Sequence, residues 1–508
     1  MGMDAGRRPP TRTCAVNRRG FLGLLGGAAV LAGCGVDQTG EQLSSTSRLP
    51  ARFRVPLPIP PVKRPDGDVY ELTQREAAVE ILPGLRTPIL GYDGIFPGPT
   101  IESRRGRPIV VRHRNELSVP TATHLHGGHT PHEHDGWPLD LVLPTGGWHA
   151  FPHGMTGDTT TGARDYHYPM AQRAATLWYH DHRMDFTGPA VYRGLAGFHI
   201  VRDDVEDALP LPRGDRELPL MICDRSFEED GSFAYPGLDQ AMRSVPGVRE
   251  EWMEGVLGDV VLVNGAPWPV HEVDAARYRL RLLNASNARR YRVAMSPALP
   301  LVQIGSDGGL LAAPVTHGSI DMAPGERFDV VVDFSAVPVG TEVTMTNGLG
   351  TGGTAGIMRF RVVRKAADDS RVPARLAAVE PLPEPVRTRV FQFNRGAVGD
   401  HKGWTINGRT FAPGSAQADS PLGEVERWRL VTDVHHPVHV HLDHFQVLSR
   451  GDRKPRPTDR GWKDTVDLRP AEVVDIAVRF TDYRGRFVMH CHNLEHEDMA
   501  MMATVRTV

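Results

Sequence analysis

The chain has 508 residues and a formal net charge of −3. This length exceeds what one hydrophobic core usually organises, so roughly three domains are expected. The near-neutral charge argues against a dedicated nucleic-acid-binding protein, which would normally be basic. The contents of 40% hydrophobic and 23% charged residues are typical of a soluble globular protein. With 53 glycines, 42 prolines and only 7% aromatic residues, the composition favours an all-β fold with many turns.

Residues 1–34 have the pattern of an export signal. Basic residues precede an apolar run at 21–33 that is too short to span a bilayer as a mature helix. The run Asn17-Arg18-Arg19-Gly20-Phe21-Leu22 resembles the twin-arginine export signal, and Leu31-Ala32-Gly33-Cys34 resembles a bacterial lipobox. These resemblances imply export across the cytoplasmic membrane, cleavage before Cys34 and a lipid anchor on that residue at the cell envelope. The alternative is a chance cysteine near an ordinary cleavage site.

Short β-rich runs separated by turn residues follow in three blocks. A polar tether rich in serine and threonine is predicted over residues 35–52. The blocks cover residues 53–205, 215–364 and 387–508, and residues 365–386 form a linker rich in alanine, proline and charge. The run Val263-Asn264-Gly265 is echoed by Ile406-Asn407-Gly408 and, more loosely, by Tyr92-Asp93-Gly94. These echoes suggest three related β-domains.

Histidine is the outlier of the composition, with 23 residues. Three segments carry a His-X-His pair, and a fourth reads His490-Cys491-His492. On a strand, residues i and i+2 share a face, so Cys491 faces away from both flanking histidines. One strand could therefore join two metal sites back to back. The paired histidines are, in chain order, His124 and His126, His180 and His182, His439 and His441, and His490 and His492.

The residues around Cys491 suggest a copper site. Two histidines, one cysteine and a weak axial methionine are the ligands of a blue-copper electron-transfer site. His496 and Met501 follow Cys491 on a loop or short helix, and His436 lies close enough to turn towards it. His435 competes with His436, which has the favoured spacing. The eight paired imidazoles could hold three further copper ions, whereas surface histidines gathered by chance would not repeat the pair four times.

In order and spacing, the four segments resemble the four copper motifs of the multicopper oxidase family. The stretches 126–136 and 492–498 are most similar to the three-domain branch with spore-coat laccases, bilirubin oxidases and phenoxazinone synthases. The resemblance implies an all-β chain of three cupredoxin-like Greek-key β-barrel domains with four copper ions. It assigns the type 1 copper to His436, Cys491, His496 and Met501, the type 2 copper to His124 and His439, one type 3 copper to His126, His180 and His492, and the other to His182, His441 and His490.

The resemblance also implies an activity. A small aromatic reductant, such as a phenol, an aromatic amine or a bilin-like pigment, would give single electrons to the type 1 site. Cys491 would pass them to the other three coppers, where O2 is reduced to water. Asp135 and Glu497 are the carboxylates expected to supply protons, and a role in orienting ligand histidines is compatible with this.

Two other functions compete with this activity. A metallo-oxidase acting on Cu(I), Mn(II) or Fe(II) is the main alternative, disfavoured because the sequence has no Met-rich insert. A non-catalytic copper store is disfavoured by the complete set of motifs.

The remaining histidines and cysteines suggest no further site. A solvated loop is favoured over an extra metal site for the histidine-rich stretch 129–153, because its spacing repeats no ligand pattern. Cys223 lies in the apolar run 220–223, which predicts a buried, unpaired thiol. The histidine-rich stretch 129–153 contains His129, His132, His134, His149 and His153.

Overall fold

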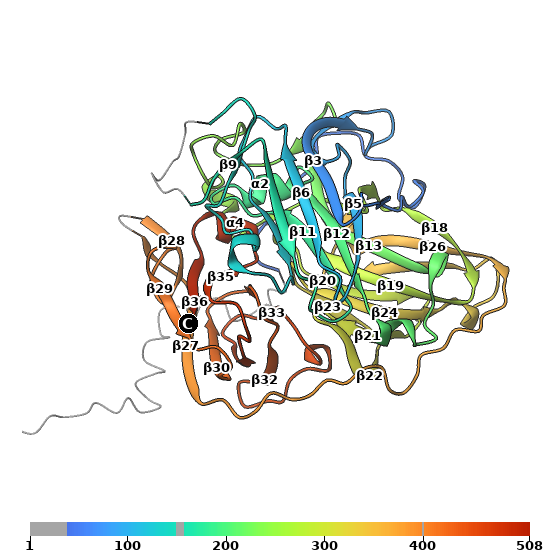
Figure 1. Cartoon of the computed structure of the whole chain (residues 1–508). Coiled ribbons are helices and arrows are strands. Elements are labelled where there is room, and N and C mark those ends of the chain that lie inside the picture. Colours follow the sequence, from blue (N-terminus) through green and yellow to red (C-terminus); the bar gives the residue numbers. More distant parts are fainter. Residues whose placement is uncertain (1–37, 149–156, 399–400) are drawn as a thin grey trace, which may run out of the picture. The chain divides into compact units, whose positions relative to one another are not determined.

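The computed structural model describes residues 38–148, 157–398 and 401–508 (Figure 1). The expected export signal and Cys34 lie outside these residues. Residues Gln38–Val508 form one compact unit. Strands make up nearly all of its regular structure, so the predicted all-β class is confirmed. Among the described residues, no helix is both long enough and apolar enough to cross a membrane.

The first part of the chain folds into two sheets that enclose a core around Leu72, Val111 and Leu177. One sheet has the order β10 (Ala163–Tyr168), β6 (Ile109–Asn115), β3 (Val69–Val79) and β4 (Thr87–Tyr92). The other has the order β2 (Val62–Lys63), β5 (Gly98–Arg104), β12 (Ala196–Arg202), β11 (Ala175–Asp181) and β7 (Thr123–His126). The short elements beside this first sandwich are η1 (His132–His134), β8 (Val142–Leu143), β9 (Thr160–Thr161), α2 (Thr187–Tyr192) and α3 (Asp204–Asp207).

The middle of the chain forms a second sandwich, which begins after η2 (Gly214–Arg216). Its larger sheet has the order β17 (Ala266–Pro267), β16 (Val260–Val263), β13 (Glu217–Phe227), β19 (Arg277–Asn284), β24 (Arg327–Asp333), β21 (Leu301–Ser306) and β22 (Gly309–His317), with β14 (Phe233–Ala234) paired to β13. Its smaller sheet has the order β18 (Val270–Ala275), β26 (Gly356–Lys365), β25 (Glu342–Asn347), β20 (Tyr291–Ser296) and β23 (Ile320–Met322). The 3-10 turns of this sandwich are η3 (Glu250–Trp252), η4 (Phe334–Ala336) and η5 (Gly352–Ala355).

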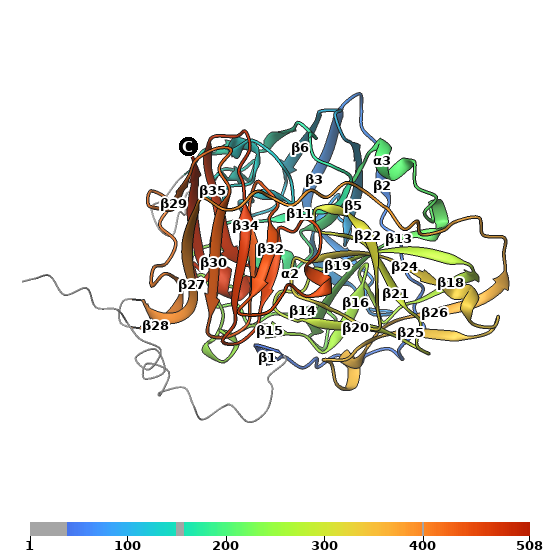
Figure 2. The same cartoon turned by 90° about the horizontal axis from the view of Figure 1, so that it is seen from below.

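The last part of the chain forms a third sandwich, coloured orange to red in Figure 2. One sheet has the order β28 (His401–Ile406), β27 (Arg387–Val398), β30 (Glu426–Thr432), β34 (Val473–Val478) and β32 (Gln446–Arg450). The other has the order β29 (Ala416–Ser420), β36 (Met502–Thr507), β35 (Gly485–Cys491), β31 (His436–Val440) and β33 (Thr465–Leu468). The short helices of this sandwich are η6 (Pro457–Asp459) and α4 (Leu494–Asp498).

The three sandwiches repeat one local arrangement. In each, one long strand pairs antiparallel with a neighbour (β3 with β4, β13 with β16, β27 with β28) and parallel with a later strand (β6, β19, β30). The turns Asp93-Gly94, Asn264-Gly265 and Asn407-Gly408 follow β4, β16 and β28, and both residues of each turn have positive φ. Asn-Gly and Asp-Gly favour such turns because these residues tolerate that backbone region. The sequence echoes therefore mark one structural position in three related sandwiches.

Residues 38–52, which the sequence predicts to be a tether, lie against the second and third sandwiches. The strand β1 (Glu41–Gln42) pairs in parallel with β15 (Val256–Leu257). The hydroxyl of Thr39 lies 2.9 Å from Nδ1 of His435, and the hydroxyl of Ser45 donates to the carboxylate of Asp259. The hydroxyl side chains that suggested a solvated tether instead make specific hydrogen bonds.

Candidate metal centre

The four histidine segments meet where strands of the first and third sandwiches end. In the first sandwich, β7 pairs with β11 so that His124 lies opposite His180. In the third, β31 pairs with β35 so that His439 lies opposite His490. The second histidine of three pairs follows directly after a strand. All eight paired histidines are buried: His124, His126, His180, His182, His439, His441, His490 and His492.

Three imidazoles converge through their Nε2 atoms. Nε2 of His490 lies 3.3 Å from Nε2 of His182 and 3.3 Å from Nε2 of His441. On the other side of the rings, Nδ1 of His441 lies 2.7 Å from Asp135, and Nδ1 of His490 lies 3.0 Å from Glu497. An imidazole that donates through Nδ1 keeps a lone pair on Nε2. The lone pairs of His441 and His490 repel one another unless a cation lies between them, and Nε2 of His182 is equally close to His490, so this group fits a metal ion.

A second group of three imidazoles contains buried nitrogens without partners. One ligand atom from each of His126, His180 and His492 lies within 4.8 Å of the others. Among the described residues, Nδ1 of His126, Nε2 of His180 and both nitrogens of His492 have no hydrogen-bond partner. Leaving such atoms unpaired in the interior is costly. Metal coordination would satisfy them.

His124 and His439 form a pair that joins the two sandwiches. Their Nε2 atoms lie 3.4 Å apart, although the residues are 315 positions apart in the chain. Nδ1 of His124 donates to the backbone oxygen of Asp135, and Nδ1 of His439 donates to that of Asp464. Both Nε2 atoms are therefore left free to bind a metal, and His441 lies within 4.8 Å of this pair.

The thiol of Cys491 lies in a separate site on the opposite face of β35. Its Sγ atom is 3.4 Å from Nδ1 of His436 and 3.6 Å from Nδ1 of His496, and these two nitrogens are 3.1 Å apart. Met501 is buried in the same apolar cluster, and its backbone bonds to both Cys491 and His496. His496 lies on α4, the short helix that brings it back to Cys491. Two imidazoles, a thiol and a nearby thioether fit a blue-copper site.

Burial sets the protonation of these groups. It lowers the pKa of His180 to about 3 and that of His182 to about 4, so both rings are neutral at pH 7, the form that binds metals. Burial also raises the pKa of the Cys491 thiol, so the thiolate forms when a metal displaces the proton. The pKa of the Asp135 carboxyl is raised for the same reason. The two imidazoles and the thiol are therefore uncharged before a metal binds.

One carboxylate of the centre is absent from the sequence prediction. Oδ1 of Asp464 lies 3.0 Å from Nε2 of His126, and Asp464 also accepts two hydrogen bonds from Arg327. Asp464 follows Lys463 just before β33. It repeats no ligand spacing, and its only sequence signal is an acidic residue beside a buried strand.

The described histidines of the stretch 129–153, which the sequence predicts to be a solvated loop, do not join the metal groups. His129 lies between Asp443 and Asp482, and His132 lies beside Glu133 of its own turn. The ring of His134 contacts that of His167. His149 and His153 lie outside the described residues.

Comparison with known proteins agrees with this geometry. Residues 73–206 and 381–508 each match a family model described as multicopper oxidase. A laccase of Bacillus subtilis (strain 168) is 35% identical, over 89% of this chain and 97% of the relative. A bilirubin oxidase of Albifimbria verrucaria is also 35% identical, over 89% and 80%. The crystal structure of a multi-copper oxidase from Pediococcus acidilactici matches with a TM-score of 0.79 at 31% identity, over 92% and 93%, which confirms the cupredoxin-like fold class.

Proposed function

Because the chain belongs to the multicopper oxidase family, whose members are copper-dependent oxidoreductases with O2 as acceptor, we propose that it is a laccase-like enzyme. It couples one-electron oxidation of phenols, aromatic amines or bilin-like pigments to four-electron reduction of O2 to water. The observation that carries the proposal is the position of Cys491. Its thiol lies in one site with His436 and His496 (the thiol site), and its neighbours His490 and His492 belong to the group of eight paired histidines (the histidine cluster). The relatives named laccase and bilirubin oxidase support the aromatic substrate class.

Twelve side chains would hold four copper ions. When bound, copper supplies one-electron transfer at the thiol site and O2 reduction at the histidine cluster. The type 1 ion would take His436, Cys491, His496 and Met501, the type 2 ion His124 and His439, one type 3 ion His126, His180 and His492, and the other His182, His441 and His490.

The thiol site and the histidine cluster lie on opposite sides of one strand, so they are distinct but close together. Cys491 packs into the apolar core of the third sandwich, whereas His490 and His492 point into the histidine cluster. The thiol is then connected to each imidazole through the backbone of two adjacent residues. The burial of all these side chains excludes bulk water from both sites.

Asp135 and Glu497 are the proposed proton donors. Both are buried, and each contacts histidines of the cluster: Asp135 lies against His441, and Glu497 lies between His182 and His490. A carboxylate held at this position can exchange protons with a small molecule in the cluster. The same contacts orient the imidazoles, so the two roles coexist.

We further propose that the enzyme works outside the cytoplasmic membrane. The twin-arginine and lipobox resemblances of residues 1–34 support this location and a lipid anchor on Cys34. Mass spectrometry of the mature amino terminus tests it, because a diacylated cysteine at position 34 is the expected product. An unmodified terminus at another residue contradicts the anchor.

The activity is tested by O2 uptake with a panel of reductants. A dimethoxyphenol, bilirubin, an o-aminophenol, Cu(I), Mn(II) and Fe(II) are compared at one pH, and copper is counted per chain. The expected result is a higher kcat/KM with an aromatic compound than with any metal ion. A kcat/KM for a metal ion far above that of every aromatic compound identifies a metallo-oxidase, and bound copper without O2 uptake identifies a copper store.

A further inference from the structure

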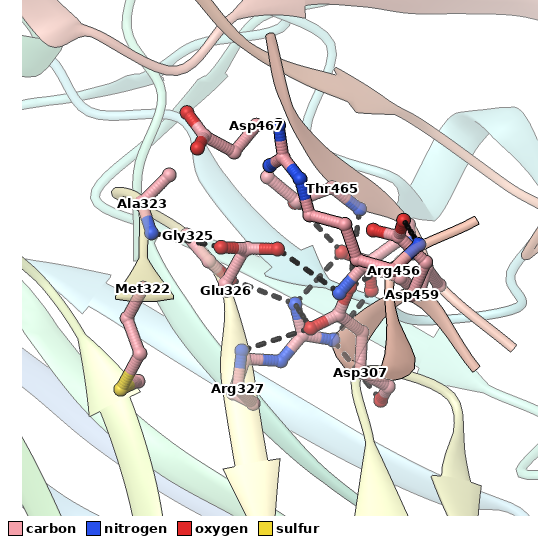
Figure 3. Close-up of polar contacts among 12 residues, drawn as sticks. Asp307, Met322, Ala323, Gly325, Glu326, Arg327, Arg456, Asp459, Thr465 and Asp467 are labelled. Atoms are coloured by element: carbon pink, nitrogen blue, oxygen red, sulfur yellow. Dashed lines mark hydrogen bonds and ion pairs between the residues drawn. The ribbon is translucent and has the colours of Figure 1, made fainter. Parts of the chain in front are cut away.

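Arg327 connects all three sandwiches beside the histidine cluster. It is buried at the start of β24, in the second sandwich, which supplies none of the twelve proposed ligands. Its Nε donates to the backbone oxygen of Thr176 on β11, at 3.0 Å, and its Nη1 donates to Oδ1 of Asp464, at 2.7 Å. Its Nη2 donates to the other oxygen of Asp464. Figure 3 shows Arg327 beside Asp307, which also lies close to Thr465.

Asp464 in turn contacts histidines from two sandwiches. Its Oδ1 lies 3.0 Å from Nε2 of His126 in the first sandwich, and its backbone oxygen accepts from Nδ1 of His439 in the third. Nε2 of His126 must carry a proton to donate to this carboxylate. Nδ1 of His126, the atom without a partner, then keeps its lone pair for the group with His180 and His492. Asp464 thereby selects the tautomer of His126.

Asp464 needs a cation to hold this position. A buried carboxylate without a partner would carry a large desolvation cost. Arg327 meets both carboxylate oxygens at once, which neutralises the charge and fixes the plane of the group. Asp135 and Glu497 differ, because the ion pairs found for them are with histidines. Among these three carboxylates, Asp464 is therefore the one whose charge and orientation Arg327 holds.

Further residues of the second sandwich hold the same segment. Nζ of Lys463 lies 2.9 Å from Oδ2 of Asp307 and 3.1 Å from Oε1 of Glu326. Oδ2 of Asp307 also accepts from the backbone N–H groups of Asp464 and Thr465, each at 3.3 Å. Figure 3 shows Asp307, Glu326 and Arg327 together at this junction. The backbone and the side chain of Asp464 are thus both held by the second sandwich.

We propose that Arg327 is a positioning residue for the histidine cluster. By holding Asp464, it fixes the tautomer of His126 and the orientation of His439. The second sandwich, which supplies no ligand, thereby sets the copper affinity of a site formed by the other two. This inference rests on the copper assignment of the proposed function.

The test compares Arg327→Gln and Arg327→Lys with the matched control Arg289→Gln. Arg289 is also a buried arginine of the second sandwich, but it donates to Asp224 and Gly258 of that same sandwich. Each holoprotein is titrated with a copper chelator. Cluster copper is followed by metal content and the type 2 paramagnetic resonance signal, and the thiol site by its blue absorption. Melting temperatures of the copper-free proteins report the general structural cost.

The expected result is a cluster copper affinity 10- to 100-fold lower in Arg327→Gln than in the control, as is common for residues that orient metal ligands. The blue absorption stays, and Arg327→Lys recovers part of the affinity because it keeps the charge without the bidentate fork. Equal cluster affinities in Arg327→Gln and Arg289→Gln overturn the inference. If Arg327→Gln does not fold, Arg327→Lys is compared with Arg289→Lys by the same criterion. A wild-type protein that binds no copper in the cluster contradicts the proposed function instead.

Discussion

Cys491 and His490 are neighbours on β35, but their side chains lie in different sites. Sγ of Cys491 is 3.4 Å from Nδ1 of His436, whereas Nε2 of His490 is 3.3 Å from Nε2 of His441. The alternation of side chains along a strand produces this separation. Under the proposed function, the backbone and side chains of these two adjacent residues would form the path of an electron from the thiol site to the histidine cluster.

The replacement Cys491→Ser tests whether copper at the thiol site can be removed while copper in the histidine cluster stays bound. A serine hydroxyl is a harder ligand than a thiolate and keeps its proton, so the intense blue absorption and the oxidase turnover are expected to disappear. Copper bound by the paired histidines is expected to remain. Absorption spectra, O2 uptake and copper content measure the three effects. Retention of the blue absorption refutes the assignment of Cys491.

Met501→Leu tests the axial position of the thiol site. The swap nearly conserves volume, so it is expected to cost less than about 1.5 kcal/mol of stability. Loss of the weak thioether ligand is expected to raise the reduction potential while the copper stays bound. A redox titration of the blue absorption measures the change. Met502→Leu is the control, because Met502 belongs to a different apolar cluster, and a shift in Met502→Leu alone contradicts the assignment.

The ligands could be predicted from sequence because their signals are local. His490, Cys491 and His492 follow a period-2 pattern that the other histidine pairs repeat. Each ligand segment can therefore be recognised from its own residues. The contact between Arg327 and Asp464 could not be predicted in this way. These residues are 137 positions apart, and neither belongs to a repeated spacing. Their meeting depends on how the second sandwich packs against the third.

The segment that begins at Gln38 shows the same limit. Its serine and threonine content is typical of a solvated linker, but Thr39 and Ser45 find partners at His435 and Asp259. Composition indicates whether a segment is soluble when it is exposed to solvent. It does not reveal which protein surface the segment packs against. Conversely, the Asn264-Gly265 echo was informative because its turn conformation is dictated locally.

Glu497→Gln tests proton supply to the histidine cluster. Glutamine keeps the shape and can still accept from His490 through its amide oxygen, but it cannot exchange a proton at that position. We expect kcat to fall by about 10²-fold or more, with KM for the reductant little changed. Glu495→Gln is the control, because Glu495 lies on the same helix, is equally buried and bonds instead to Tyr235 and Asn287. Equal kcat values in the two variants contradict the proposed role.

The copper-free protein is expected to lose stability in acid. Burial lowers the pKa of His180 to about 3 and that of His182 to about 4, from 6.5 in an unfolded chain. Stability from these neutral rings is fully present above about pH 6.5 and falls as the pH drops towards 4. Each ring contributes about 1.4 kcal/mol per pH unit in that window, so the pair contributes about 4 kcal/mol between pH 6.5 and 5. Urea midpoints of the copper-free protein at pH 7.5 and 5 measure the loss, and equal midpoints contradict it.

His129 is expected to stabilise the contact between the first and third sandwiches in the opposite pH direction. Burial opposes its ionisation, but Asp443 and Asp482 raise the pKa of His129 to about 9. The stability that it contributes is therefore fully present below about pH 6.5 and lost as the pH rises through about 9. Because Asp482 is half exposed, solvent screening reduces the contribution to about 1–2 kcal/mol.

His129→Gln is thus expected to lower the melting temperature at pH 6 and to have little effect at pH 10. The control is His132→Gln, because His132 pairs with Glu133 within its own turn and does not connect sandwiches through that pair. Calorimetry of the holoprotein at both pH values, with the wild type measured at each, isolates the difference. A loss of the same size at pH 6 and pH 10 shows that His129 acts through packing and not through its charge.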